Sequence, residues 1–168
     1  MDLYLKQAKT QEDAASLARL ASAIWTEYYA AIITTEQIDY MLGKFQSEAA
    51  ILDQIRNQAL DYFLMQANGE DVGYLAVKEE AGQLFLSKFY VLKEQRGQGY
   101  ASQAMAFLEK LCRSRGLRSI WLTVNRYNAS SIAIYEKKGF VKVRTQVADI
   151  GNGYVMDDYI MEKNLPDA

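Results

Sequence analysis

The sequence predicts an α+β fold built on one mixed, mostly antiparallel sheet. Three strand-like apolar runs, residues 62–67, 72–79 and 83–92, follow one another with short glycine-containing turns between them, as in an antiparallel meander. From Ala101 the apolar spacing changes to three and four, which predicts a helix as far as Gly116. This helix must return the chain to a strand parallel to residues 83–92, so we expect one crossover rather than a repeating βαβ pattern.

The remaining elements lie on either side of this meander. Before it we expect a strand over residues 3–8 and helices over 10–25, 35–42 and 47–58, which open with serine or threonine caps and acidic first turns. After the crossover helix come a strand over 119–124, a short helix over 130–138 that Gly139 closes, and a strand pair over 140–150 and 154–163.

Composition limits the classes of protein that this chain can represent. With 168 residues, half of them apolar, and no linker-like segment, the chain predicts a single domain over residues 1–168. A net charge of -2 with scattered Lys and Arg argues against a nucleic-acid partner. The first ten residues, MDLYLKQAKT, lack a signal-peptide pattern, and no apolar run approaches the ~18 residues that span a bilayer. We therefore expect a cytoplasmic protein with no membrane partner.

The reactive side chains exclude further classes. The chain has no histidine, so it carries neither a Ser-His-Asp triad nor a Cys/His zinc cluster, and we expect no metal. Its single cysteine, Cys112, cannot form an internal disulfide and falls on the apolar stripe of the predicted crossover helix. A buried structural thiol explains it better than a nucleophile without a histidine base.

The stretch EQRGQGYAS, residues 94–102, places two glycines and an arginine between a strand and a helix. The first N–H groups of a helix have no internal partner and carry the positive end of its dipole, so a turn that exposes them binds anions. Gly97 and Gly99 let the backbone approach a ligand closely, and Arg96 adds a fixed charge, which together suit a diphosphate. A tight turn that needs glycine for geometry alone is the alternative.

Two other phosphate motifs fit this stretch less well. A Walker loop requires GxxxxGK followed by Ser or Thr, which is absent. The dinucleotide fingerprint would place Gly or Ala at Ser102 and an acidic residue at the end of the next strand, where Val124 and Asn125 stand. A dinucleotide-dependent enzyme is nevertheless kept as a competing hypothesis, and NAD binding at the turn would support it.

The residues RGQGYA are similar to the (Q/R)xxGx(G/A) signature of the Gcn5-related N-acetyltransferase (GNAT) family, with Arg96, Gly99 and Ala101 in the signature places. Downstream, NASSIAIYEKKGF resembles the second motif of this family in the spacing of Asn128, Tyr135, Gly139 and Phe140. Both motifs and their strands cover residues 83–140. The resemblance implies a GNAT-like central sheet with helices on both faces and one splayed parallel strand pair.

The resemblance also implies acetyl-CoA as the acetyl donor. Its pyrophosphate would lie on the glycine turn, and its pantetheine arm would lie where the strand before the turn splays from the strand after the helix. The residues implied to bind the cofactor are Phe89, Tyr90, Val91, Arg96, Gly97, Gln98, Gly99, Tyr100, Ala101 and Asn128. Asn128 is equally well explained as a helix cap, and the two roles are compatible.

Tyr135 is the catalytic residue that the resemblance implies, as the acid that protonates the departing CoA thiolate. The alternative is a core aromatic beside Ile132 and Ile134. Direct attack needs a free amine, because an ammonium has no lone pair, so a base or a water chain must remove its proton. Many relatives carry a Glu on the strand before the turn, whereas Ser87 and Lys88 stand in that region here, so no base is assigned.

Aromatic and acidic residues are mixed in the stretch WTEYYAAIITTEQIDYML, which suits a cationic amine acceptor. Glu27 and Tyr28 are the candidate substrate-binding residues, and Glu27 is also a candidate base. An ordinary helix surface or a dimer contact explains the same residues equally well. Near the C-terminus, Asp157 and Asp158 are adjacent on a predicted strand, so only one of them can face a pocket.

The overall layout, with WTEYY early and GYVMDDYIMEK late, resembles the PaiA-like bacterial acetyltransferases that act on spermidine and spermine. This implies acetyl transfer to a primary amine, by direct attack in a ternary complex, with a small cationic amine such as a polyamine as acceptor. A protein N-terminal acetyltransferase or a non-catalytic acetyl-CoA-binding module would share both motifs. The acceptor, the base and the oligomeric state, a homodimer included, stay open.

Overall fold

The structure is a computed structural model that describes residues 2–166. Its contacts divide the chain into two compact units, each built from two segments: unit 1 combines residues 1–78 with 88–108, and unit 2 combines residues 79–87 with 109–168. Met1, Asp167 and Ala168, which the predicted domain over residues 1–168 includes, lie outside the described residues. The single domain stays a prediction.

Within residues 2–166, seven strands form one sheet in the order β1-β2-β3-β4-β5-β7-β6. The pairs β1/β2, β2/β3, β5/β7 and β6/β7 are antiparallel, and β4/β5 is parallel. The predicted α+β class, with a mostly antiparallel sheet and one parallel pair, is therefore confirmed. The strands are β1 Tyr4–Gln7, β2 Asp61–Ala67, β3 Glu70–Glu80, β4 Gln83–Val91, β5 Ser119–Asn125, β6 Val141–Gly151 and β7 Tyr154–Asn164.

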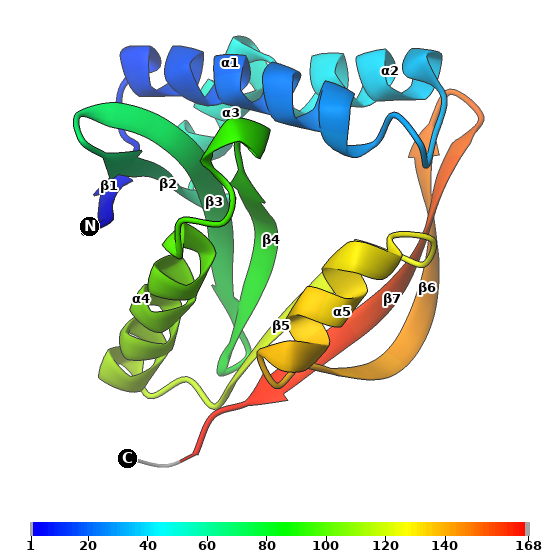
Figure 1. Ribbon diagram of the computed structural model, residues 1–168. Coiled ribbons are helices and arrows are strands. Elements are labelled where there is room, and N and C mark those ends of the chain that lie inside the picture. Colours follow the sequence, from blue (N-terminus) through cyan, green and yellow to red (C-terminus); the bar gives the residue numbers. More distant parts are fainter. Residues whose placement is uncertain (1, 167–168) are drawn as a thin grey trace. The chain divides into compact units, whose positions relative to one another are not determined.

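The helices occupy the segments where the apolar spacing predicts them (Figure 1). They are α1 Gln11–Tyr28, α2 Thr35–Phe45, α3 Glu48–Arg56, α4 Tyr100–Arg115 and α5 Ala129–Lys137, with the 3₁₀ turn η1 Lys93–Gln95 before α4. The helix α1 continues beyond its predicted end at Trp25, so Glu27 and Tyr28 belong to its last turn. Within the described part of the chain, no helix is long and apolar enough to cross a lipid bilayer.

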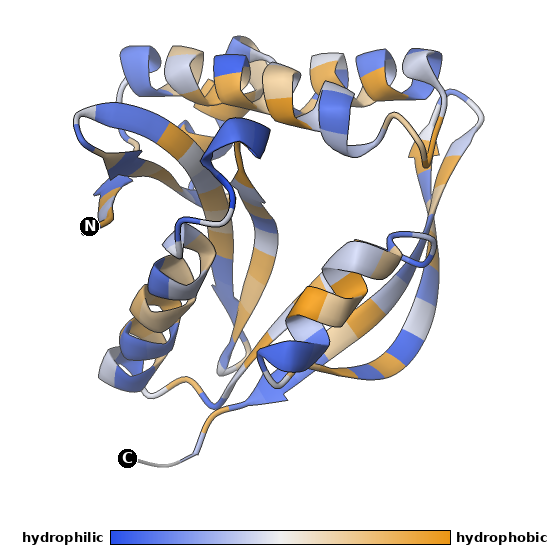
Figure 2. Ribbon diagram, in the orientation of Figure 1, coloured by the Kyte–Doolittle hydropathy of each residue, from blue (hydrophilic) through white to orange (hydrophobic). Residues whose placement is uncertain are grey.

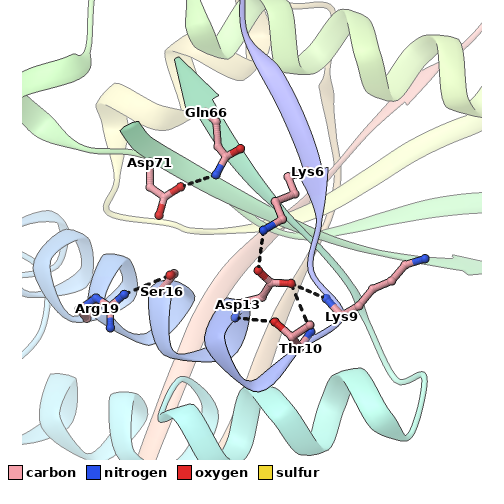
Figure 3. Close-up of polar contacts among 8 residues, drawn as sticks. All are labelled: Lys6, Lys9, Thr10, Asp13, Ser16, Arg19, Gln66 and Asp71. Carbon is pink, nitrogen blue, oxygen red and sulfur yellow. Dashed lines mark hydrogen bonds and ion pairs between the residues drawn. The ribbon is translucent and has the colours of Figure 1, made fainter. Parts of the chain in front are cut away.

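A capping box begins α1 at Thr10, where the sequence predicts a serine or threonine cap (Figure 3). The Thr10 hydroxyl accepts a hydrogen bond from the Asp13 N–H at 3.1 Å, and the Asp13 carboxylate accepts from the Thr10 N–H at 3.2 Å and from the Lys9 N–H at 2.9 Å. Lys6 on β1 adds an ion pair with Asp13 at 3.0 Å. Burial alone would raise the pKa of Asp13, but the Lys9, Lys6 and Thr10 contacts outweigh it and lower the pKa. The start of α1 is thereby tied to β1.

In unit 1, α1, α2 and α3 pack against one another, and a buried polar chain links them to the sheet. The Tyr74 hydroxyl of β3 donates to Gln46 Oε1 at 2.7 Å, and Gln46 Nε2 donates to the Tyr62 hydroxyl of β2 at 3.0 Å. The Tyr62 hydroxyl in turn donates to Gln54 Oε1 of α3. Because both tyrosines are fully buried, each hydroxyl needs its glutamine partner. These hydrogen bonds hold the turn between α2 and α3 against β2 and β3.

Gly73 brings β3 very close to the end of β4. A Cβ atom at this position would overlap the carbonyl oxygen of Tyr90 and would lie 3.0 Å from Val91 Cα and 3.1 Å from Met65 Sδ. The Leu92 N–H donates to the Val72 carbonyl at 2.9 Å, and this bond holds the end of β4 against β3 beside Gly73. Only glycine permits this approach, and it determines where the last residues of β4 lie.

In unit 2, the parallel ladder between β4 and β5 is short. It pairs Gln83–Phe85 with Ser119–Trp121, although β4 runs on to Val91 and β5 to Asn125. Gln83 Nε2 donates to Ser119 Oγ at 2.7 Å at one end, and the Phe85 and Trp121 rings stack with centroids 4.2 Å apart at the other. These two contacts fix the register of the ladder.

We predict that Gly73→Ala destabilises the protein by about 1–3 kcal/mol, because the new methyl group must displace the β4 backbone. Gly43→Ala is the matched control: Gly43 lies in α2, and a Cβ there would meet nothing within 4 Å. It should stabilise the protein by up to about 1 kcal/mol through helix propensity. Urea unfolding of both variants measures the difference, and equal effects would show that Gly73 is not sterically required.

Candidate active site

Two glycines with left-handed backbone form the turn between β4 and α4 in unit 1. Gly97 has φ 81° and Gly99 has φ 84°, which L side chains rarely adopt. A Cβ atom at either position would meet nothing within 4 Å, so the conformation rather than crowding requires glycine. The segment from η1 through this turn is hydrophilic (Figure 2). The backbone of the turn is therefore open to a polar ligand.

The start of α4 supplies the donors for such a ligand. Its first intrahelical hydrogen bond runs from the Gln103 N–H to the Gly99 carbonyl at 3.1 Å. The amides of Tyr100 and Ala101 precede this bond, in the turn where helix N–H groups point along the axis and carry the positive end of the dipole. The Tyr100 side chain is buried and anchors the turn. This is the geometry that the sequence predicts for an anion site.

Arg96 lies at the edge of the turn and contacts the last turn of α1. Its Nη2 donates to Glu27 Oε1 at 2.7 Å, and its Nε donates to the Val91 carbonyl at 3.1 Å. Its guanidinium also lies over the Tyr28 ring, 5.9 Å from the centroid. The predicted phosphate-binding arginine and the two predicted substrate-binding residues, Glu27 and Tyr28, are thus direct neighbours. No local sequence pattern predicts this contact, because Arg96 and Glu27 lie 69 positions apart in the chain.

Aromatic side chains surround Tyr90 on the α1 side of unit 1. The Tyr90 ring meets the rings of Trp25, Tyr28 and Tyr74 with centroids 5.9, 5.4 and 5.6 Å away. Its hydroxyl lies 3.1 Å from the Tyr29 hydroxyl. Burial, followed by the neighbouring tyrosines, raises the pKa of Tyr90 well above its usual value, so the phenol stays neutral. The side chain of Tyr90 thus packs on α1, and its predicted cofactor contact would be made by its backbone.

The candidate base Glu27 is held by Arg96. Side chains in this ion pair are 35% and 39% exposed, so water screens the interaction. Lys88, on the strand where many GNAT relatives carry a glutamate, is half-buried, and desolvation of its ammonium lowers its pKa to about 8. Arg96 thus engages the Glu27 carboxylate, and Lys88 is a second candidate base because its lowered pKa leaves part of it neutral near pH 8. The base is therefore still unassigned between these two residues.

In unit 2, Asn128 caps the short helix α5. Its Oδ1 accepts hydrogen bonds from the Ser131 N–H and the Ser130 hydroxyl, both at 3.3 Å, and the residue is 6% exposed. The cap role that the sequence suggests is therefore present. The cofactor contact that the GNAT resemblance implies for Asn128 stays a prediction.

Tyr135, the predicted catalytic acid, also lies on α5. It is half-buried, and its ring meets the buried Phe140 ring edge to face at 5.6 Å. The Phe140 N–H donates to the Tyr135 carbonyl at 3.0 Å across Gly139, whose φ of 97° ends the helix. The motif residues Tyr135, Gly139 and Phe140 thus form one closed turn that fixes the tyrosine backbone.

Cys112 is fully buried, and burial followed by the nearby Glu109 and Glu79 raises the pKa of its thiol to about 11. This agrees with the expected structural thiol. Among residues 2–166, no group of three or more His, Cys, Asp or Glu side chains could hold a metal ion. A hollow of about 150 Å³ in unit 2 is lined by none of the predicted site residues but by Glu80, Ala81, Gln83, Trp121, Arg144, Ile160 and Glu162.

Comparison with known proteins agrees with the motifs and the fold. The sequence profile of the family described as "Acetyltransferase (GNAT) family" matches residues 17–140, which include the glycine turn and α5. Over 81 residues, the chain is 35% identical to the uncharacterized N-acetyltransferase YycN of Bacillus subtilis; this alignment covers 45% of the chain and about half, 52%, of that relative. It is 25% identical over 154 residues to the uncharacterized N-acetyltransferase Mb2688 of Mycobacterium bovis, covering 91% of the chain and 98% of the relative.

Among solved structures, the chain is similar to the PaiA N-acetyltransferase of Thermoplasma acidophilum in complex with coenzyme A. The TM-score is 0.80 at 24% sequence identity, and the match covers 98% of this chain and 100% of that one. The chain belongs to the acetyltransferase (GNAT) family. The expected fold, enzyme class and acetyl-CoA cofactor are thereby confirmed at the level of the family.

We predict that Arg96→Ala weakens acetyl-CoA binding about 10–100-fold, because charge-assisted hydrogen bonds to the diphosphate are lost. Glu27→Gln should strengthen it up to about fivefold, since Glu27 competes for the same guanidinium in an exposed ion pair. In the Arg96→Ala background, Glu27→Gln should have no effect. Isothermal titration calorimetry measures these affinities, with pantetheine, which has no diphosphate, as the control ligand. Equal losses for both ligands would rule out phosphate binding by Arg96.

Proposed function

We propose that this protein transfers the acetyl group of acetyl-CoA to the primary amine of a small cationic acceptor such as a polyamine, by direct attack in a ternary complex. The observation that carries the proposal is the family match over residues 17–140, which falls on a turn whose glycines have the required left-handed backbone. A cytoplasmic location and a homodimer stay predictions from the sequence.

Within this proposal, the cofactor diphosphate lies on the turn from Arg96 to Ala101. The amides at the start of α4 and the Arg96 guanidinium provide the positive field, and Gly97, Gln98 and Gly99 keep the approach free of Cβ atoms. Backbone groups of Phe89, Tyr90 and Val91 would meet the pantetheine arm and acetyl group. Because Gly73 sets the position of Tyr90 and Val91, this part of the cofactor site depends on the spacing of β3 and β4.

The chemistry in this proposal needs no covalent enzyme intermediate. A free amine nitrogen attacks the thioester carbonyl, the new C–N bond forms, the C–S bond breaks, and the CoA thiolate takes a proton from the Tyr135 hydroxyl. The proton that the attacking nitrogen gives up restores the tyrosine. A buried, protonated Cys112 is no nucleophile, which supports direct attack over an acyl-cysteine route.

The residues around Arg96 bear on the class of acceptor. A cationic amine is supported by Glu27 and by the aromatic faces of Tyr28 and its neighbours, which attract positive charge. Arg96 already occupies one carboxylate oxygen of Glu27, so Glu27 would bind an ammonium only together with or in place of Arg96. Two alternatives, a protein N-terminal acetyltransferase and a non-catalytic acetyl-CoA-binding module, use the same cofactor residues, so only acceptor assays separate them.

We predict that the protein releases CoA thiol from acetyl-CoA with one class of amine, and that Tyr135→Phe lowers kcat at least about 100-fold with little change in acetyl-CoA affinity. The panel should contain spermidine, spermine, aminoglycosides, amino acids and short peptides. Transfer to peptides alone would favour the N-terminal acetyltransferase. Acetyl-CoA binding without thiol release for any acceptor would favour the binding module, and unchanged turnover in Tyr135→Phe would make that tyrosine a packing residue.

A second prediction isolates the glycine turn. Gly99→Val should abolish acetyl-CoA binding and leave a folded protein, because the branched side chain both disfavours the left-handed backbone and fills the open approach. Gly153→Val is the control, since Gly153 has φ 79° and equally open surroundings in the β6–β7 turn. It should show similar strain and normal cofactor binding. Calorimetric titration measures both, and an unaltered affinity of Gly99→Val would show that the turn is only structural.

A further inference from the structure

The adjacent aspartates on β7 point to opposite faces of the sheet, and they differ in their partners. Asp157 Oδ1 lies 2.9 Å from Arg126 Nε in an ion pair whose side chains are each 32% exposed. Asp158 is 7% exposed, and its Oδ1 atom is buried and accepts no hydrogen bond from any residue in the range 2–166. Of the two carboxylates, Asp158 is therefore the buried one, and its Oδ1 atom has no hydrogen-bond partner within the described residues to offset the loss of water.

The strand register defines the surroundings of Asp158. It lies directly opposite Asn125 on β5 and Gln146 on β6, so these three side chains share one face. The next pair along this face brings Thr123 and Arg144 beside Ile160. The direct neighbours are thus uncharged amides, and Arg144, one pair further along, is the nearest basic residue on the face by register.

A buried carboxylate in these surroundings is costly. Burial, followed by repulsion from Asp157, raises the pKa of Asp158 from 3.8 to about 6. Because this folded-state pKa is raised, the contribution of Asp158 to stability is greatest below pH 3.8 and is lost as the pH rises through about 6. At neutral pH the native chain thus carries a charge that destabilises it, and a bound cation would compensate that charge.

We propose that Asp158 is the group that binds the ammonium of the acceptor and takes its proton. This inference rests on the proposed amine acetylation. It assigns a base in place of the glutamate that many GNAT relatives carry on the strand before the glycine turn and that β4 lacks here. Asn125 and Gln146 flank the carboxylate by register, and amide oxygens are groups that accept N–H bonds from an ammonium. Asn125 Oδ1 already accepts the Tyr127 N–H at 3.0 Å. The family match covers residues 17–140, so β7 lies beyond the matched residues.

The proton step balances without any further reactant. An N–H bond of the ammonium breaks and an O–H bond forms on Asp158, so an ion pair becomes a neutral amine and a neutral carboxylic acid. The amine then has the lone pair that attack on the thioester requires. A carboxyl group whose pKa is about 6 returns its proton to water near neutral pH, which readies the site for the next acceptor.

The hollow in unit 2 begins one pair further along the same face. Ile160 and Arg144, one pair along the face from Asp158, line it together with Trp121, Gln83 and Glu162. Asp158 itself is not among the described residues that line it. In the proposal, the rest of the acceptor extends from Asp158 along β7 towards this hollow. Two glutamates against one arginine in its lining favour an acceptor chain that carries additional positive charge.

The test compares Asp158→Asn with Asp157→Asn, which removes the neighbouring carboxylate from the opposite face. Steady-state rates are measured from pH 5 to 9 with acetyl-CoA and the best amine of the panel. We expect Asp158→Asn to lower kcat/KM for the amine at least about 30-fold, with the KM for acetyl-CoA within about twofold. The wild-type kcat/KM should fall below pH 6, and this acidic limb should be absent from the variant. Asp157→Asn should stay within about threefold of wild type.

Thermal unfolding separates this role from a structural one, because the two roles predict opposite changes in stability for Asp158→Asn. Asp158→Asn should raise the unfolding midpoint at pH 8 by roughly 2–4 °C or more, and this gain should shrink towards pH 5, where the native carboxyl is already protonated. A structural aspartate would instead lose stability on the same substitution. Stabilisation together with lost activity supports the proposal, and destabilisation with retained activity overturns it.

The remaining outcomes also decide. If Asp158→Asn does not fold, the wild-type profile is sufficient: an acidic limb near pH 6 supports Asp158, whereas a limb near pH 8 assigns the proton to Lys88 and overturns the inference. If wild type acetylates an amine and Asp158→Asn does so equally well, the inference fails and the proposed function stands. If wild type binds acetyl-CoA and acetylates no amine, the proposed function fails and the inference falls with it.

Discussion

The close approach of β3 to β4 at Gly73 is the constraint on which much of unit 1 depends. It places the backbone of Tyr90 and Val91 directly over a residue without a side chain. From there the Tyr90 ring packs against the aromatic residues of α1, and the Val91 carbonyl accepts a hydrogen bond from Arg96 Nε. A single missing methyl group thus determines both the packing of α1 and the anchoring of the glycine turn.

Different interactions hold the Tyr90 side and the Arg96 side of this arrangement. The Tyr90 side is apolar and neutral, since burial keeps the phenols of Tyr74 and Tyr90 protonated, and it contributes stability through ring packing. The Arg96 side is exposed and charged, so its ion pair with Glu27 contributes little to stability and is easily exchanged for another anion. The unit is therefore rigid where the strand must be held and adaptable where a charged ligand would arrive.

Local features of the fold follow from the sequence because short-range rules determine them. The threonine cap of α1, the glycine turn and the Gly139 helix end were all predictable, and the structure has each of them. The site differs, because its contacts join distant segments. Neither the pairing of Arg96 with Glu27 nor the link through Gln46 follows any local pattern. The alternation rule showed that only one of Asp157 and Asp158 can face inward, but the register and burial were needed to identify which one.

The burial of the single cysteine has a practical consequence for a chain of this family. Each acetyl transfer from acetyl-CoA produces one equivalent of a small, reactive thiol, and an enzyme with an accessible cysteine would be exposed to mixed-disulfide formation with oxidised forms of its own product. Here the only sulfhydryl is enclosed and protonated. The folded chain offers its product no exchange partner, so a chromogenic disulfide reagent added during turnover would report the coenzyme alone and leave the protein intact.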